Sequence, residues 1–155
     1  MIYGAIDEKS EQGYTNLKKV FDSIDNKQNE YNWLITDCEC YPYEEMNNKE
    51  YSWLTGEELT ELVNKENFQC IWAVLSGFDK NIELSEVLNY DLPYADGYRG
   101  FWKLPVTIQH PLACIEIVPW DSTLVLCISK EKEIVDKFLN GYKYSQTLEE
   151  YINKD

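Results

Sequence analysis

The segment Phe68-Gln69-Cys70-Ile71-Trp72-Ala73-Val74-Leu75 decides which fold this chain can adopt. It is an almost continuous apolar run, whereas a strand with one solvated face alternates apolar and polar residues. Continuous runs of this kind are typical of strands that are covered on both faces. We therefore predict a strand over 68–75 at the centre of a sheet.

Periodicity and turn residues predict the elements around this strand. The other predicted strands cover 1–6, 31–41, 114–118 and 123–129, and the predicted helices cover 15–24, a stretch opened by Thr55, 130–139 and 145–153. Thr55-Gly56-Glu57-Glu58 matches a capping box. The last two strands form a hairpin through Pro119-Trp120-Asp121-Ser122, so the sheet is at least partly antiparallel. The sequence predicts an α+β fold with a mixed or antiparallel central sheet and packed helices.

Length and composition favour one globular domain over residues 1–155. The 155 residues are long enough to bury a sizeable core. Hydrophobic residues make up 44% of the chain and aromatic residues 14%. Disordered acidic chains are poor in aromatic residues, so this composition indicates a folded protein.

Half of the net charge of −14 lies between residues 31 and 62. This stretch carries one base, Lys49, and eight acids: Asp37, Glu39, Glu44, Glu45, Glu50, Glu57, Glu58 and Glu61. Acids that crowd together repel one another, so such a patch favours contact with something basic. A pI near 4.4 argues against binding of nucleic acid or of anionic membranes.

Aromatic residues interleave with these acids and supply rigid area that a partner can bury. We predict a site that binds a basic protein, formed by Asp37, Glu39, Tyr43, Glu44, Glu45, Glu50, Tyr51, Trp53, Glu57, Glu58 and Glu61. Trp33, Tyr43, Tyr51 and Trp53 are the expected aromatic anchors. Trp33 has a second interpretation as a core residue if its strand is central.

The beginning of the chain and its cysteines favour a cytoplasmic protein. Residues 1–8 lack the basic and apolar regions of a signal peptide. No window has the apolar length of a membrane span. Five cysteines, an odd number, fit a reducing compartment.

Motifs for catalysis or cofactor binding are weak in this sequence, and we expect no cofactor. Cys38-Glu39-Cys40 puts two thiols on one face of a strand, but no paired spacing supplies the other ligands of a zinc site. Buried filler is therefore the favoured role for the cysteines. His110 is the sole histidine, and Pro111 opposes the helix that would bring it to Cys114.

Two resemblances add to this interpretation. The stretches 93–102, 108–113 and 116–122 (PYADGYRGFW, IQHPLA and EIVPWDS) resemble a small uncharacterised bacterial family without a known activity. That resemblance covers about the last two-thirds of the chain. In size, acidity and aromatic content, the chain is similar to cytosolic immunity proteins of bacterial toxin systems, which bind and block one cognate toxin, often a basic nuclease. This second resemblance implies an immunity-type inhibitor and assigns no residues.

Three other roles stay open. A small hydrolase or transferase would use residues 89–111 as a lid, with His110 and Asp96 as its reactive groups. A DNA-mimic inhibitor would space its acids like phosphates along an elongated face. The aromatic loop 89–105 is also a candidate contact of a homodimer.

Overall fold

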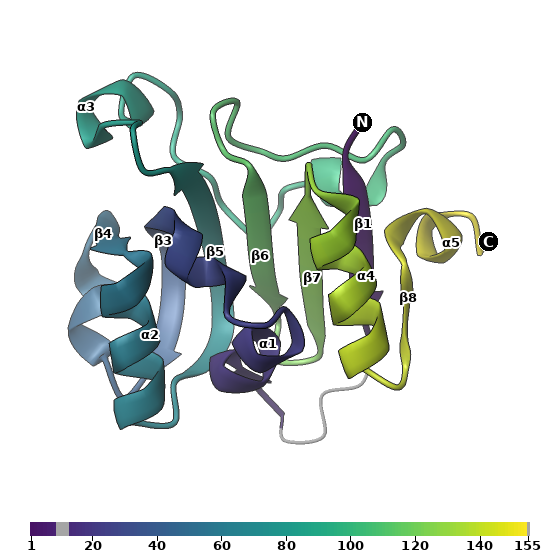
Figure 1. Cartoon of the computed structure of the whole chain (residues 1–155), viewed down its shortest axis with the longest axis horizontal. Coiled ribbons are helices and arrows are strands. Elements are labelled where there is room, and N and C mark those ends of the chain that lie inside the picture. Colours follow the sequence, from purple (N-terminus) through teal and green to yellow (C-terminus); the bar gives the residue numbers. More distant parts are fainter. Residues whose placement is uncertain (9–12, 155) are drawn as a thin grey trace.

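A computed structural model describes residues 1–8 and 13–154 of the chain. In these residues the centre of the fold is a sheet of eight strands in the order β4-β3-β5-β6-β7-β1-β8, with the short β2 also paired to β5 (Figure 1). Every strand pair is antiparallel. The predicted α+β class is confirmed, and the sheet is of the antiparallel kind.

The strands are β1 (Tyr3–Asp7), β2 (Thr15–Asn16), β3 (Tyr31–Tyr41), β4 (Tyr51–Thr55), β5 (Gln69–Asp79), β6 (Ile115–Trp120), β7 (Leu124–Ser129) and β8 (Ser145–Thr147). The α-helices are α1 (Leu17–Ser23), α2 (Gly56–Lys65), α3 (Leu84–Val87), α4 (Lys132–Gly141) and α5 (Leu148–Ile152). Short 3₁₀ helices form η1 (Lys27–Glu30), η2 (Glu44–Asn48) and η3 (Gly100–Trp102).

The strand β5 has the central place that its sequence predicts. It pairs with β3 along most of its length and with β6 and β2 on its other side. It also runs to Asp79, four residues beyond the predicted end at Leu75. Leu75 packs in the cluster on one face of the sheet, and Val74 packs in the cluster on the other. The continuous apolar run therefore reflects burial on two sides.

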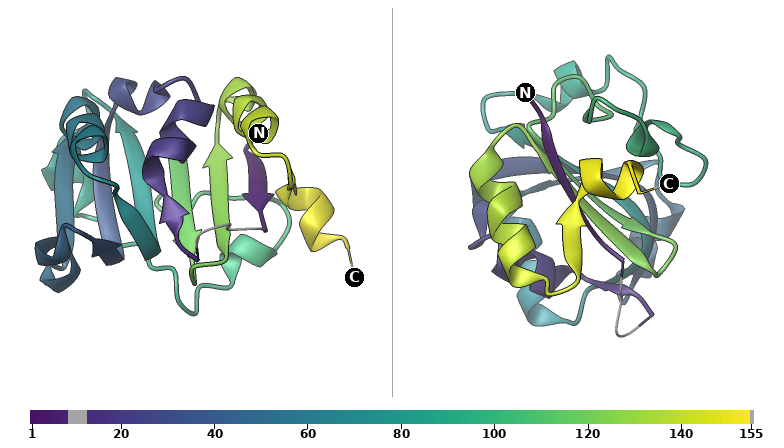
Figure 2. Two further views of the ribbon diagram at one scale, coloured as in Figure 1. Left: turned by 90° about the horizontal axis from the view of Figure 1, so that it is seen from below. Right: turned by 90° about the vertical axis from the view of Figure 1, so that its right-hand side faces the viewer.

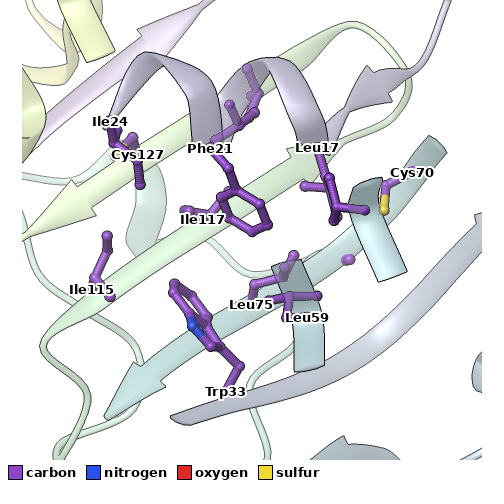
Figure 3. Packing of buried hydrophobic residues seen from close by; sticks show 14 of the residues in the cluster. Leu17, Phe21, Ile24, Trp33, Leu59, Cys70, Leu75, Ile115, Ile117 and Cys127 are labelled. Carbon is purple, nitrogen blue, oxygen red and sulfur yellow. The ribbon is translucent and has the colours of Figure 1, made fainter. Parts of the chain in front are cut away.

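Helices cover one face of the sheet. Figure 2 shows α1, α2 and α4 on the same side. In β3, Tyr31, Trp33 and Ile35 point to this side and are buried. Trp33 is fully buried beside Phe21 (Figure 3), and its indole N–H donates to the Gln28 carbonyl oxygen at 2.9 Å. Its core role is confirmed, and it is no anchor for a partner.

A long connection, residues 80–114, covers the other face together with α5 (Figure 2). Ala95 and Phe101 of this connection pack with Val118, Leu126 and other side chains of the sheet. The connection contains α3 and η3 but no strand. Tyr98, Phe101 and Trp102 therefore belong to a second core, whereas Tyr90 and Tyr94 are exposed.

Three strands, β2, β4 and β8, differ from the sequence prediction. No strand was predicted at β4, although Tyr51 and Trp53 alternate there with smaller residues. At the C-terminal end, a helix was predicted over 145–153, whereas residues 145–147 form β8 and only Leu148–Ile152 is helical. The reason is local: Thr147 pairs with β1 and its side chain caps the helix that follows. The helix predicted over 15–24 begins at Leu17 for a similar reason, because residues 15–16 pair with β5 as β2 and the Asn16 side chain caps the helix.

The predicted capping box at Thr55 and Glu58 is confirmed, and it starts α2 against η1. Gly56, the first residue of this helix, lies directly on the backbone of η1. A Cβ on Gly56 would lie 2.7 Å from the Asn29 Cα and 2.8 Å from the Tyr31 carbonyl oxygen. Because these are backbone atoms, a change of side-chain rotamer cannot relieve their overlap with a Cβ at position 56.

Gly56→Ala is expected to lower the free energy of unfolding by about 2 kcal/mol, because the overlap outweighs the helix propensity of alanine. Asn64→Ala, at an exposed position of the same helix, is the matched control and should stabilise by roughly half a kcal/mol. Urea denaturation of both variants measures the difference. A Gly56→Ala variant that is as stable as the control would contradict the close contact of α2 with η1.

A carboxyl group is buried under the 80–114 connection. Glu116 of β6 is fully buried, and Ser76 of β5 lies directly opposite. The Oε2 atom of Glu116 accepts a hydrogen bond from the backbone N–H of Gln109 at 3.1 Å. Within the described residues, the Oε1 atom of Glu116 has no hydrogen-bond partner. Burial raises the pKa of Glu116 to about 8, although the Gln109 hydrogen bond acts in the opposite direction. The folded protein therefore holds this carboxyl protonated near neutral pH.

This raised pKa makes stability depend on pH. Between about pH 4.5, its ordinary pKa, and about pH 8, the folded state keeps a proton that the unfolded chain has lost. Stability therefore falls as pH rises through this range, by up to about 1.4 kcal/mol per pH unit. Glu116→Gln should remove this dependence, so the stability difference between variant and wild type should grow from pH 5 to pH 8 in favour of the variant. Urea denaturation across this range measures it, and a constant difference would contradict the buried carboxyl.

Candidate protein-binding surface

The strand β4 forms one edge of the sheet (Figure 1). The Thr55 amide donates to the Glu58 carboxylate at 2.9 Å, so it points away from β3. In an antiparallel pair, the direction of the backbone groups alternates from residue to residue. The N–H and C=O groups of Tyr51 and Trp53 therefore point to the free edge, while Ser52 and Leu54 bond to β3. This edge offers two donors and two acceptors to an added strand.

A hollow of about 300 Å³ lies beside this edge. It is lined by Tyr43, Glu45, Met46, Lys49, Tyr51, Ser52, Trp53, Leu54 and Leu62. The lining includes four consecutive residues of β4, whose side chains alternate between the two faces of the sheet, together with residues of η2 and α2. The hollow therefore follows the edge of the sheet, where a partner strand would place its side chains.

Side-chain hydrogen bonds hold the wall of the hollow in place. The Asn47 amide of η2 binds both backbone groups of Cys40 in β3, at 2.8 and 3.1 Å. The Tyr43 hydroxyl donates to the Leu62 carbonyl oxygen at 2.8 Å, and its ring packs on Phe68 at 5.0 Å. These contacts tie η2 to β3 and α2. A partner would meet a preformed wall, which lowers the entropy lost on binding.

Tyr51 and Trp53 are half-buried on the side of the sheet opposite α2. Trp53 packs on Phe78 with ring centroids 5.8 Å apart. Each ring keeps part of its surface in solvent. This arrangement suits an interface anchor, because the ring is already ordered before a partner arrives.

Five of the predicted acids are exposed and form no ion pair within the described residues: Glu39, Glu44, Glu45, Glu50 and Glu61. Glu45 lines the hollow itself, and Glu44 belongs to the same short helix. Glu50 directly precedes β4, and Glu61 precedes Leu62 on α2. Among the residues that the structure describes, Lys49 is the one base that lines the hollow. The charge around the β4 edge is therefore strongly negative.

Four other predicted residues have structural roles. Asp37, at a bulge of β3 with a φ of 49°, accepts hydrogen bonds from the Ala95 and Asp96 amides at 2.8 and 3.3 Å. Glu57 pairs with Lys80 at 2.7 Å, which lowers the pKa of Glu57. Glu58 caps α2, and Tyr43 holds η2 as described above. For Asp37, the bulge turns the carboxylate to the 80–114 connection and away from the β4 edge.

Sequence reasoning missed the apolar part of the hollow, which Met46, Leu54 and Leu62 supply. None of these three is distinctive as a sequence signal. The alternation of Tyr51 and Trp53 with Ser52 and Leu54 was an available sign of a strand. The acidic residues on both sides of it obscured that sign.

His110 is buried, and both of its ring nitrogens have backbone partners. Nε2 lies 2.9 Å from the Val87 carbonyl oxygen, and Nδ1 accepts from the Leu112 amide at 3.1 Å. The ring also packs on Phe78 and Tyr90. Burial lowers the pKa of His110, so the neutral ring is favoured. These contacts give His110 a structural role in holding the 80–114 connection.

Three of the five cysteines come together in space. Cys38 and Cys40 lie on one face of β3, as predicted, and their Sγ atoms are 2.8 Å apart. Cys70 of β5 brings its Sγ to 2.7 Å from that of Cys40, a proximity the sequence did not indicate. Among the described residues, no group of three or more His, Cys, Asp or Glu side chains has an arrangement that could hold a metal ion.

Comparison of the chain with protein-family models, with curated proteins and with solved structures gives no match. Within the described residues, no helix has the length and apolar character needed to cross a membrane.

The hydrogen bonds from the Ala95 and Asp96 amides to Asp37 can be tested as a contact that holds the 80–114 connection to β3. Asp37→Gly tolerates the positive φ but removes the acceptor, and we expect a loss of about 1–2 kcal/mol in the free energy of unfolding. Asp37→Asn keeps an acceptor oxygen and is the matched control, with stability near that of the wild type. Hydrogen exchange at Ala95 and Asp96 should accelerate in the glycine variant alone. Unchanged exchange there would contradict the role of Asp37 as a tether.

Proposed function

We propose that this protein is an immunity-type inhibitor that binds and neutralises a basic toxin domain, most simply a nuclease, at the β4 edge. The observation that carries the proposal is the free edge of β4 beside a preformed hollow with unpaired carboxylates around it. The unpaired backbone groups of an edge strand can pair with a strand of another protein, so an ordered and uncovered edge supports a role in binding. The type resemblance to immunity proteins points in the same direction.

The partner segment that fits this edge is extended and carries lysine or arginine. Its backbone pairs with the outward groups of Tyr51 and Trp53, and one of its side chains enters the hollow. Its bases meet Glu45, Glu50 and their neighbours. The half-buried rings of Tyr51 and Trp53 become fully covered, and such aromatic residues carry much of the affinity of protein interfaces.

Charge gives this contact its speed and its selectivity. A net charge of −14 attracts a basic protein over distances of about a Debye length, roughly 8 Å at physiological ionic strength. In a nuclease, the bases that bind phosphates would meet carboxylates in their place. The inhibitor thereby blocks the substrate groove of the nuclease both electrostatically and sterically.

The same charge argues against other occupants of this edge. A second copy of the chain would bring acids against acids, which opposes a homodimer through β4. The hollow and its aromatic residues favour a protein partner over pure mimicry of DNA, which needs only a row of charges. A hydrolase or transferase centred on His110 lacks a free ring nitrogen for proton transfer.

The first experiment captures the partner from the source organism at low salt, elutes it with salt and identifies it by mass spectrometry. The purified partner is then assayed for nuclease activity with and without the inhibitor. We expect stoichiometric loss of activity and an association rate that falls steeply with added salt. A partner that stays fully active when bound, or an association rate that does not change with salt concentration, would contradict the proposal.

Variants then locate the contact. Glu45→Lys should weaken binding by roughly tenfold or more, whereas Glu149→Lys, an equal charge change on α5 at the other end of the sheet, should have little effect. Tyr51→Pro removes an amide that the fold does not use, and Tyr51→Val keeps it. If strand pairing is involved, the proline variant binds more weakly than the valine variant at equal stability. Equal binding of these two variants would place the contact elsewhere.

A further inference from the structure

Cys38, Cys40 and Cys70 form a thiol cluster on the helix side of the sheet. Cys40 lies between the other two, with its Sγ 2.8 Å from that of Cys38 and 2.7 Å from that of Cys70. Cys40 and Cys70 are fully buried, and Cys38 is half-buried. The cluster therefore has one thiol near solvent and two behind it.

The backbone around Cys40 places it in the kind of strand pair that permits a cross-strand bond. Cys40 is paired in register with Cys70 on the neighbouring strand. Its N–H and C=O both bind the Asn47 side chain, so neither group points to β5. In such non-hydrogen-bonded pairs the Cα atoms are about 4.5 Å apart. Disulfides span Cα distances from about 4.4 Å upward, so this pair meets their requirement.

The sulfur distances favour a disulfide over a metal site. Thiolates bound to zinc at about 2.3 Å stand nearly 4 Å apart around the ion. The contacts of 2.7 and 2.8 Å are far shorter than that. A disulfide at about 2.05 Å needs a movement of less than about 1 Å from these positions.

We propose that Cys40 and Cys70 are the site of a cross-strand disulfide, with Cys38 as the thiol through which oxidation enters. The oxidant is a peroxide. It oxidises Cys38 to a sulfenic acid and is itself reduced to water or an alcohol. Cys40 then attacks the sulfenic sulfur, which forms a Cys38–Cys40 disulfide and releases water. Finally Cys70 attacks the Cys40 sulfur, and Cys38 leaves and takes up the proton that Cys70 loses.

The surroundings of the cluster set the pace of this chemistry. Hydrogen bonding with Cys40 and burial raise the pKa of the Cys38 thiol, and burial raises that of Cys70. Since the thiolate is the reactive form, oxidation is slow at neutral pH and accelerates at alkaline pH. Burial also shields the final disulfide from reductants. The cross-link joins β3 to β5 where Asn47 fixes η2, so it should raise the resistance of this region to unfolding.

The test treats the folded protein with hydrogen peroxide and then blocks free thiols by alkylation after unfolding. Proteolysis and mass spectrometry identify the linked peptides. We expect a Cys40–Cys70 link with a loss of two hydrogens, alkylated Cys38, Cys114 and Cys127, and a raised melting temperature. Five alkylated thiols after exhaustive oxidation, or a Cys38–Cys40 link as the end product, would overturn the proposal.

Two variants test the order of the steps. Cys38→Ser should slow formation of the Cys40–Cys70 link by roughly tenfold or more, because the other two thiols are buried. Cys127→Ser, at another buried cysteine, is the matched control and should leave the rate unchanged. Equal rates in the two variants would contradict an entry role for Cys38. Wild-type protein oxidised in concentrated urea should give mixed links, which would show that the fold selects the pair.

Discussion

Burial of β5 on both faces is the constraint on which the rest of this structure depends. One face is covered by α1, α2 and α4, and the other is covered by a connection with little regular structure of its own (Figure 2). Such a connection cannot satisfy its backbone groups by itself, so buried polar side chains must bind it. His110 and Glu116 do so from buried positions, and Asp37 does so from an exposed position on β3. Each of them binds a backbone amide or carbonyl group of residues 87–112. The burial of one apolar strand thus explains the structural roles of these three polar residues.

An open antiparallel sheet also has edges, and the two edges differ. β8 has three residues, whereas β4 has five and borders a hollow. An exposed edge invites aggregation unless charge protects it. The acids around β4 oppose pairing with a second copy of the same chain, and in the proposed function they also attract the basic partner. Under that proposal, one feature of the sequence serves both protection of the edge and selection of the partner.

The end of β3 links the features of functional interest. Its bulge at Asp37 turns one carboxylate to the 80–114 connection, and Cys38 and Cys40 face the helices. The backbone of Cys40 holds η2 and hence the wall of the hollow. A change in this short segment, such as a cross-link from Cys40 to Cys70, would therefore act close to the proposed binding surface.

The sequence alone determined the α+β class, the central strand, the late hairpin and the capping box of α2, because these depend on local periodicity and turn chemistry. It also located the acidic and aromatic stretch, since charge and composition need no coordinates. The tertiary structure decided which acids stay exposed, that Trp33 is core and that Cys70 meets Cys40. It also placed the strand of residues 51–55 at the edge of the sheet. These outcomes depend on register and on contacts between residues 15 to 58 positions apart, which no local pattern encodes.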